Sequence, residues 1–258
     1  MDPLVRIGFQ SLCLPKFSEI HISITFSWDI EFGKNLQAYW RSFGKVRLGG
    51  PAFKSPCNRF QPGKYVKQGI VFTSRGCNFR CPWCLVPEYE GRFRTIPIQE
   101  GNIIQDNNIL LANRNHLEKV FAMLRKQTAI SFKGGLDIRL LKDWHIQEFR
   151  SLRIQELWLA LDEWERRDRF REVCFRLIKA GFRRNQIRAY CLAGYEEEPI
   201  QACEDRLKFI YKCGALPFIQ VYQDPRIRTF KILERDKDFV RKWSRPAIIK
   251  TIMRGISP

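Results

Sequence analysis

The fold of this chain is decided by one stretch of sequence, Ile70-Val71-Phe72-Thr73-Ser74-Arg75-Gly76-Cys77-Asn78-Phe79-Arg80-Cys81-Pro82-Trp83-Cys84. It begins with an apolar run that is typical of a buried strand. It then enters a loop that holds three cysteines with the spacing C-x3-C-x2-C. In α/β proteins the loops at the carboxyl ends of parallel strands build the active sites. The stretch therefore predicts a first strand that carries a reactive loop at its end.

Outward from this strand, short β-like runs recur at roughly 30-residue spacing as far as Tyr222. The predicted strands are Gly69–Thr73, Asn102–Asp106, Ala129–Phe132, Glu156–Leu161, Ile187–Leu192 and Leu216–Tyr222. The predicted helices between them are Arg114–Gln127, Leu141–Leu152, Arg166–Ala180 and Glu196–Cys213. This alternation predicts an α/β fold with a parallel sheet over residues 69–222. Six βα units form a partial barrel, because a closed one needs eight.

The first 53 residues have a separate pattern. A strand at His21–Trp28, a helix at Phe32–Phe43 and a short strand at Val46–Leu48 predict one small β-α-β unit over 1–53. Residues 54–68 contain prolines and glycines without periodicity and are predicted to be a linker.

The last part of the chain, 223–258, is predicted to be a basic extension with helical structure. Its sequence begins irregularly and ends in a predicted helix around Phe239–Arg254. Pro246 lies inside this helix and is expected to kink or split it, because proline lacks the N–H that an inner helical position donates.

Composition excludes several classes of protein. The chain has 258 residues, 45 Lys and Arg against 27 Asp and Glu, and a formal charge of +18. A hydrophobic share of 45% is too high for a disordered chain. No apolar run approaches the roughly 18 residues that span a bilayer, and Met1–Arg6 lack a secretion signal. We therefore expect a cytoplasmic protein with no membrane contact. Its basic surface would attract nucleic acid. The plainer explanation of the positive charge is that it keeps the protein in solution.

The cysteines favour a metal site. Nine cysteines in a chain without an export signal indicate metal ligands or catalytic thiols rather than disulfides. Zinc usually takes four ligands, and the sequence has neither a second C-x2-C pair nor histidines at zinc-finger spacing. Three thiolates suit a [4Fe–4S] cluster with one open iron, as a catalyst requires. The alternatives are an incomplete zinc site and three cysteines buried in a core.

The segment Gly76–Cys84 resembles the signature of the radical S-adenosylmethionine (SAM) superfamily. In those enzymes C-x3-C-x-aromatic-C follows the first strand of a partial βα barrel, and Trp83 stands at the aromatic position. Ile104–Asn108 is similar to the segment that holds the SAM amino group, and Tyr190–Tyr195 to the glycine segment that packs against adenine. The resemblance covers at least Gly69–Tyr222.

Two features resemble the cobalamin-domain and methylthiotransferase-like branch of that superfamily. Phe132–Arg139 is similar to its third-strand segments, and the β-α-β unit with Gly49-Gly50-Pro51 looks like a truncated form of its N-terminal domain. Cobalamin itself is not expected, because the Asp-x-His-x-x-Gly motif that ligates it is absent around His21.

The resemblance implies an enzyme that binds a [4Fe–4S] cluster through Cys77, Cys81 and Cys84. SAM would chelate the open iron, and its reductive cleavage would give methionine and a 5′-deoxyadenosyl radical that abstracts hydrogen from a substrate. Such an enzyme needs a one-electron reductant of the flavodoxin or ferredoxin type. The sequence does not name the substrate, for which RNA and peptides are the candidates.

The resemblance also implies residues that hold SAM, and each has a plainer alternative. Trp83 would pack near the cluster and the adenine, or simply exclude solvent. Asp106 or Asn108 would accept hydrogen bonds from the SAM ammonium, or cap a turn at the end of a strand.

The later strands supply the other candidates. Gly134 and Gly135 would let the backbone approach SAM closely, or would form a tight turn. Asp162 would bind the ribose hydroxyls, or cap the helix that begins at Glu163. Gly194 would lie next to the adenine.

A rival function comes from a different class of protein. The basic flanks contain Trp40 with Arg47, and Lys242 with Trp243, and cations beside aromatic rings are typical of nucleic-acid binding. In that interpretation the metal is structural, and the protein would bind zinc or a closed cluster and ignore SAM.

Overall fold

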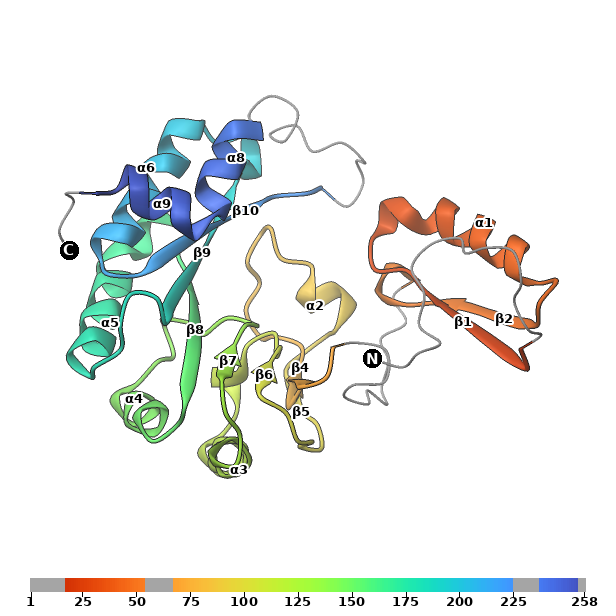
Figure 1. Cartoon of the computed structure of the whole chain (residues 1–258), viewed down its shortest axis with the longest axis horizontal. Coiled ribbons are helices and arrows are strands. Elements are labelled where there is room, and N and C mark those ends of the chain that lie inside the picture. Colours follow the sequence, from red (N-terminus) through yellow and green to blue (C-terminus); the bar gives the residue numbers. More distant parts are fainter. Residues whose placement is uncertain (1–16, 54–66, 225–236, 255–258) are drawn as a thin grey trace.

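The main part of the molecule is a six-stranded parallel sheet flanked by helices (Figure 1). The computed structural model describes residues 17–53, 67–224 and 237–254. The strands of the sheet are β3 Ile70–Val71, β6 Ile103–Ile104, β7 Ile130–Phe132, β8 Ile154–Ala160, β9 Ile187–Ala193 and β10 Leu216–Val221. Their order in space follows their order in the chain, and all neighbours are parallel. All six predicted strands are confirmed, and this order is compatible with the predicted partial barrel.

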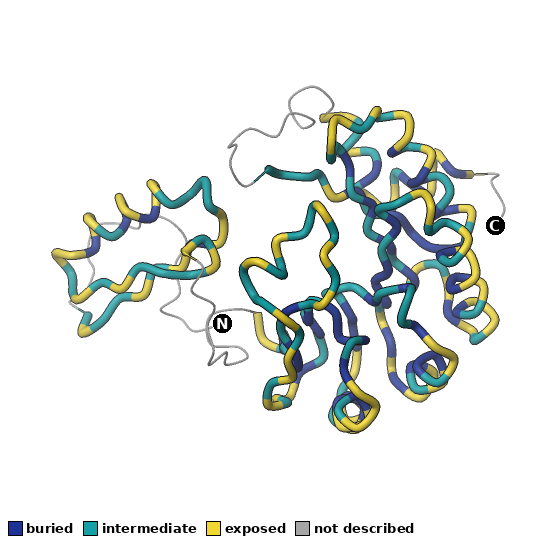
Figure 2. Tube along the Cα trace, turned by 180° about the vertical axis from the view of Figure 1, so that it is seen from behind, coloured by how far each residue is buried: buried dark blue, intermediate teal, exposed yellow. Residues whose placement is uncertain are grey.

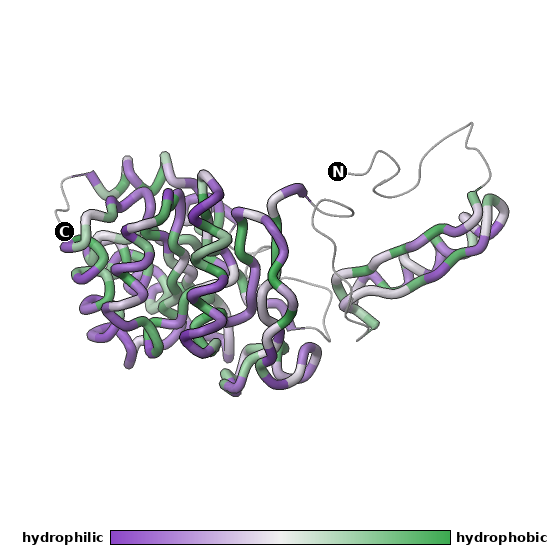
Figure 3. Tube along the Cα trace, turned by 90° about the horizontal axis from the view of Figure 1, so that it is seen from below, coloured by the Kyte–Doolittle hydropathy of each residue, from purple (hydrophilic) through white to green (hydrophobic). Residues whose placement is uncertain are grey.

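Four helices connect these strands and lie along one side of the sheet (Figure 1). They are α3 Arg114–Arg125, α4 Asp143–Arg150, α5 Arg167–Lys179 and α6 Ile200–Lys212. Each is amphipathic, and hydrophilic and hydrophobic positions alternate along the tube in Figure 3. All four predicted helices are present, and their ends agree with the prediction within two residues except at the start of α6. Helix α6 begins at Ile200 and not at Glu196, because Pro199 stands at its N-cap and Glu196 has a positive φ of 49°.

The core lies between the sheet and these helices, where Figure 2 shows the buried strand residues. Leu157, Leu159 and Ile187 have no exposed surface. Side chains alternate across a strand, so Trp158 and Tyr190 belong to the opposite face of the sheet, where their rings lie 4.4 Å apart between centroids. The sheet is therefore packed on both faces.

The connection from β3 to β6 differs from the others. Instead of a long helix, it contains α2 Val86–Tyr89 and a small antiparallel pair, β4 Ser74–Arg75 with β5 Arg94–Thr95. The cysteine loop lies in this connection. Short 3-10 turns occur at several junctions. They are η1 Ser27–Asp29, η2 Pro51–Phe53, η3 Ile109–Leu111, η4 Trp164–Arg166 and η5 Tyr195–Glu197.

The predicted N-terminal β-α-β unit is also present. Strand β1 Glu19–Ser23 pairs in parallel with β2 Lys45–Gly49, and α1 Ile30–Trp40 joins them. The first strand is shorter than predicted because the chain turns into η1 before Trp28. The predicted linker lies almost entirely outside the described residues.

Among the described residues after the sheet, 237–254 form two helices, α8 Lys237–Ser244 and α9 Pro246–Ile252. Pro246 is the first residue of α9, so the predicted split of this helical segment is confirmed. Trp243 of α8 has no exposed surface. None of the helices in the described part of the chain combines the length and the apolar character needed to span a bilayer.

Candidate active site

The three cysteines lie on one loop that leaves the carboxyl edge of the parallel sheet. Two backbone contacts fix the start of this loop. The Gly76 N–H donates to the Asn107 side chain at 2.9 Å, and the Cys77 N–H donates to the Gly91 carbonyl at 3.2 Å. Asn107 follows the neighbouring strand β6, so the loop is anchored to two strands at once. Asn107 was not among the residues predicted from the sequence, although it lies in the segment Ile104–Asn108.

The cysteine side chains are partly exposed and close enough to influence one another. Burial raises the pKa of the Cys81 and Cys84 thiols, and Cys77 raises the pKa of both further. Arg139 and Arg166 oppose this shift at Cys81. Within the described residues, no three His, Cys, Asp or Glu side chains stand in the arrangement that encloses a metal ion. The three thiols are nonetheless the ligand type and number that an iron–sulfur cluster with an open iron takes.

Asp106 and Asn108, the two candidates for the SAM ammonium, have different surroundings. The Asp106 carboxylate is 1% exposed and accepts hydrogen bonds from the Thr73 N–H at 2.7 Å and from the Thr73 and Ser74 hydroxyls at 2.6 Å. Burial raises its pKa, and these hydrogen bonds oppose the rise. Asp106 therefore holds the end of β3, the strand that leads into the cysteine loop.

Asn108 points to the cysteine loop itself. Its Nδ2 donates to Asp137 Oδ2 at 3.1 Å and lies 4.0 Å from Cys77 Sγ. Its Oδ1 is buried and accepts no hydrogen bond in the described part of the chain. A buried acceptor without a donor is costly unless a ligand satisfies it. Of the two residues, Asn108 thus offers the acceptor that an ammonium group would use.

Gly134 and Gly135 also differ from each other. A Cβ at Gly134 would lie 1.8 Å from the Asp106 carbonyl oxygen, so Gly134 permits the close approach of two strand ends. Gly135 has open space at the Cβ position and a φ of +100°, which favours glycine for its backbone conformation alone. At Gly134 the close neighbour is therefore the protein's own backbone. At Gly135 the alternative of a tight turn accounts for the glycine.

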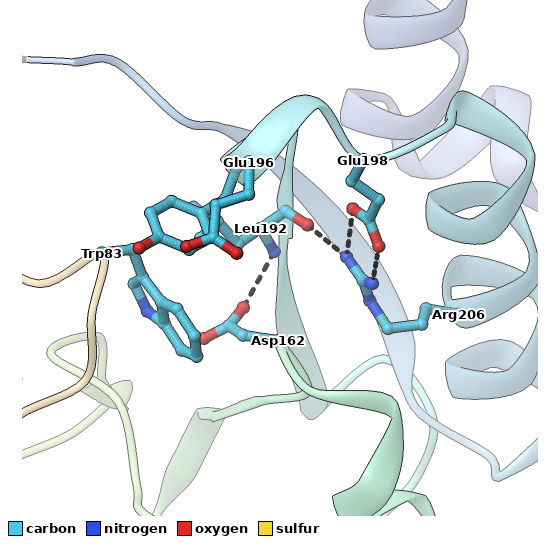
Figure 4. A pocket seen from close by; sticks show the side chains of 7 residues that line it. Trp83, Asp162, Leu192, Glu196, Glu198 and Arg206 are labelled. Atoms are coloured by element: carbon cyan, nitrogen blue, oxygen red, sulfur yellow. Dashed lines mark hydrogen bonds and ion pairs between the residues drawn. The ribbon is translucent and has the colours of Figure 1, made fainter.

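Trp83, Asp162 and the turn after Gly194 meet at one pocket of about 250 Å³ (Figure 4). Its lining consists of Trp83, Asp162, Leu192, Tyr195, Glu196, Glu198 and Arg206. The Trp83 and Tyr195 rings approach edge to face with centroids 5.6 Å apart. The structure therefore joins the cysteine loop to the ends of β8 and β9.

Asp162 does not cap a helix. The residue at the N-cap of η4 is Glu163, without a side-chain cap, and Asp162 Oδ1 instead accepts from the Leu192 N–H at 2.8 Å. Burial raises the Asp162 pKa to about 6. The carboxylate thus bridges β8 and β9 at the pocket wall.

Arg206 is a pocket residue that the sequence analysis missed. It is 5% exposed, and its guanidinium donates to the Glu198 carboxylate and to the Leu192 carbonyl at 2.5 Å. Burial lowers the pKa of this guanidinium, but the neighbouring Glu198 and Cys191 together outweigh that effect, so the net shift of the pKa is upward. Its helical spacing from Cys203 and Ile210 was the available signal, because it places Arg206 on the buried stripe of α6.

No protein-family model matches this chain, and no curated protein matches it either. The assignment of a function therefore depends on the residues and their geometry.

The aromatic residues of the rival nucleic-acid interpretation do not form free stacking surfaces. Trp40 is 8% exposed and Trp243 is fully buried. Arg47 and Lys242 each pair with a glutamate. These four side chains have structural partners, so the flanks offer weaker support for nucleic-acid binding than their sequence suggested.

Proposed function

We propose that this chain is a radical SAM enzyme built on a partial (βα)6 barrel, with Cys77, Cys81 and Cys84 as the ligands of a [4Fe–4S] cluster. One observation carries the proposal. The three thiols share a loop at the carboxyl edge of the sheet, and Asn108 and Asp162 follow strands β6 and β8 at that same edge. This is the edge at which α/β proteins assemble active sites from several strands.

When bound, the cluster and SAM would supply an electron transfer that produces methionine and a 5′-deoxyadenosyl radical, which takes hydrogen from the substrate. The chain's own residues would bind SAM and orient it next to the cluster. Asn108 Oδ1 would accept a hydrogen bond from the SAM ammonium, and Asp162 would accept one from the ribose. Trp83 would exclude water from the space between the cluster and the adenosine.

Charge favours a cationic ligand at this site. Asp162 and Glu196 both line the pocket, while Arg206 is engaged by Glu198. The SAM sulfonium and ammonium are positive, and a cleft lined by acidic groups attracts cations.

The proposal includes two partners. The reaction needs a one-electron donor of the flavodoxin or ferredoxin type. RNA and peptides remain the candidate substrates, with the net charge of +18 favouring a polyanion.

The test is anaerobic reconstitution of the full chain with iron and sulfide, followed by addition of dithionite and SAM. We expect absorption and EPR signals of a [4Fe–4S] cluster, and 5′-deoxyadenosine as a product. Cys84→Ala should abolish the product, since a cluster ligand is lost. Cys213→Ala is the matched control, because Cys213 follows α6, far along the chain from the cysteine loop, and should leave the product unchanged.

A purified chain that holds zinc and forms no iron–sulfur cluster would contradict the proposal. It would favour the basic nucleic-acid-binding protein instead. Equal product from Cys84→Ala and wild type would also contradict it.

A further inference from the structure

Arg139 lies against the cysteine loop, although it comes from the segment after β7. Its guanidinium carbon is 3.5 Å from the centroid of the Phe79 ring, and Phe79 stands between the first two cysteines. Cys81 follows Phe79 by two residues on this loop, so the guanidinium lies beside the loop between its first two cysteines. A cation thus contacts an aromatic ring of the cysteine loop.

Asp137 holds this guanidinium in place. Arg139 Nε donates to Asp137 Oδ1 at 2.8 Å and Nη2 donates to Oδ2 at 2.5 Å, which is the two-pronged geometry of a strong arginine–carboxylate pair. The Arg139 N–H donates to the same carboxylate at 3.0 Å. The hydrogen bonds to Asp137 and its charge raise the pKa of Arg139 against the effect of burial, so its positive charge is permanent.

The same carboxylate also orients Asn108, whose Nδ2 lies 3.1 Å from Asp137 Oδ2 and 4.0 Å from Cys77 Sγ. One aspartate therefore holds both the Arg139 cation and the Asn108 amide beside the cysteine loop. Partners of this kind, one step removed from a metal ligand, tune the metal that the ligand holds.

We propose that Arg139 is a positioning residue that raises the reduction potential of the cluster held by the three cysteines. This inference rests on the proposed function. Reduction adds negative charge to the cluster, and a cation fixed beside the loop that carries the ligating sulfurs stabilises that charge. Arg139 therefore makes the cluster easier to reduce before SAM is cleaved.

The experiment measures the midpoint potential of the reconstituted full chain by an EPR-monitored redox titration without SAM. The chains compared are wild type, Arg139→Gln, Arg139→Lys and Arg125→Gln, each with its iron and sulfide content determined. Arg125→Gln is the matched control, because it removes one positive charge from α3, where Arg125 pairs with Glu148.

In Arg139→Gln we expect the ratio of reduced to oxidised cluster at a fixed potential to fall about tenfold. For a one-electron couple this corresponds to a midpoint about 59 mV lower. Arg139→Lys keeps the charge but loses the forked geometry, so its midpoint should fall by less in the same direction. Arg125→Gln should match wild type.

Wild-type midpoints in both Arg139 variants would overturn the inference and leave the proposed function intact. If Arg139→Gln fails to hold a cluster, Arg139→Lys decides the question, since a lower midpoint supports the inference and an unchanged one overturns it. A wild-type chain that assembles no cluster would overturn the proposed function and the inference together.

Discussion

The two halves of the parallel sheet are held together in different ways. Strands β3, β6 and β7 have 2, 2 and 3 residues, whereas β8, β9 and β10 have 7, 7 and 6. In the short half, side chains supplement the few ladder hydrogen bonds. Asp106 holds the end of β3, and Asn102 Nδ2 donates to the Thr128 carbonyl at 2.9 Å. In the long half, the backbone hydrogen bonds of the ladder and apolar packing hold the strands together.

This difference explains where the candidate site lies. Short strands end early, so the chain leaves the sheet soon and can form the cysteine loop close to the core. Polar side chains must then fix each loop individually, because few ladder bonds remain. The long half provides a rigid wall, and the pocket lies where Trp83 of the loop meets Asp162 and Tyr195 of that wall.

The largest effect should come from removing the polar anchor of the short half. Asp106→Ala leaves the Thr73 N–H and the Thr73 and Ser74 hydroxyls buried without their acceptor. Each such group costs about 1–3 kcal/mol, so we expect the free energy of unfolding to fall by about 4 kcal/mol. Urea denaturation followed by circular dichroism measures this loss.

The matched control is Asp143→Ala, which removes an exposed aspartate that pairs with Arg176. A surface ion pair contributes about 1 kcal/mol or less. Similar losses in the two variants would show that the Asp106 network does not anchor the short half.

A smaller loss of stability should distinguish the two glycines after β7 when each is replaced by alanine. Gly134→Ala places a methyl group 1.8 Å from the Asp106 carbonyl oxygen, so the two strand ends must move apart at a cost of about 3 kcal/mol. Gly135→Ala meets no neighbouring atom and carries only its backbone strain, about 1 kcal/mol. Thermal denaturation of both variants checks the difference, and the opposite ranking would rule out a close approach at Gly134.

The smallest effect concerns Asp162 at the end of the long half, and it depends on pH. Its folded-state pKa is about 6, above the ordinary value of 3.8, so the unfolded chain releases this proton first as the pH rises. Wild type should therefore lose about 2 kcal/mol relative to Asp162→Asn between about pH 4 and pH 6, with a constant difference above that range. The asparagine keeps an acceptor for the Leu192 N–H.

Urea denaturation of wild type and Asp162→Asn at intervals of pH measures this difference. Stability profiles that stay parallel from pH 4 to pH 7 would mean that Asp162 titrates normally and is not a buried part of the pocket wall.

Sequence reasoning predicted the candidate site in outline and left its contacts open. It assigned Asp106 and Asn108 the same role because both follow one strand. Their partners distinguish them, and those partners lie directly after β3 and in the segment after β7, about 30 residues away in the chain. Sequence reasoning also gave no role to Arg206, because the partners that allow its burial, the Glu198 carboxylate and the Leu192 carbonyl, are set by the tertiary structure.

The sequence by itself determined the order of strands and helices, the division of the C-terminal helices at Pro246 and the three-cysteine loop after the first strand. These features depend on local periodicity, backbone restriction and spacing. Only the tertiary structure decided that Asp106 supports β3, that Asp162 joins β8 to β9, and that Asp137 and Arg139 reach the cysteine loop. The physical reason is that a hydrogen bond between distant segments requires a distance and an angle, and both are set by how the strands pack together.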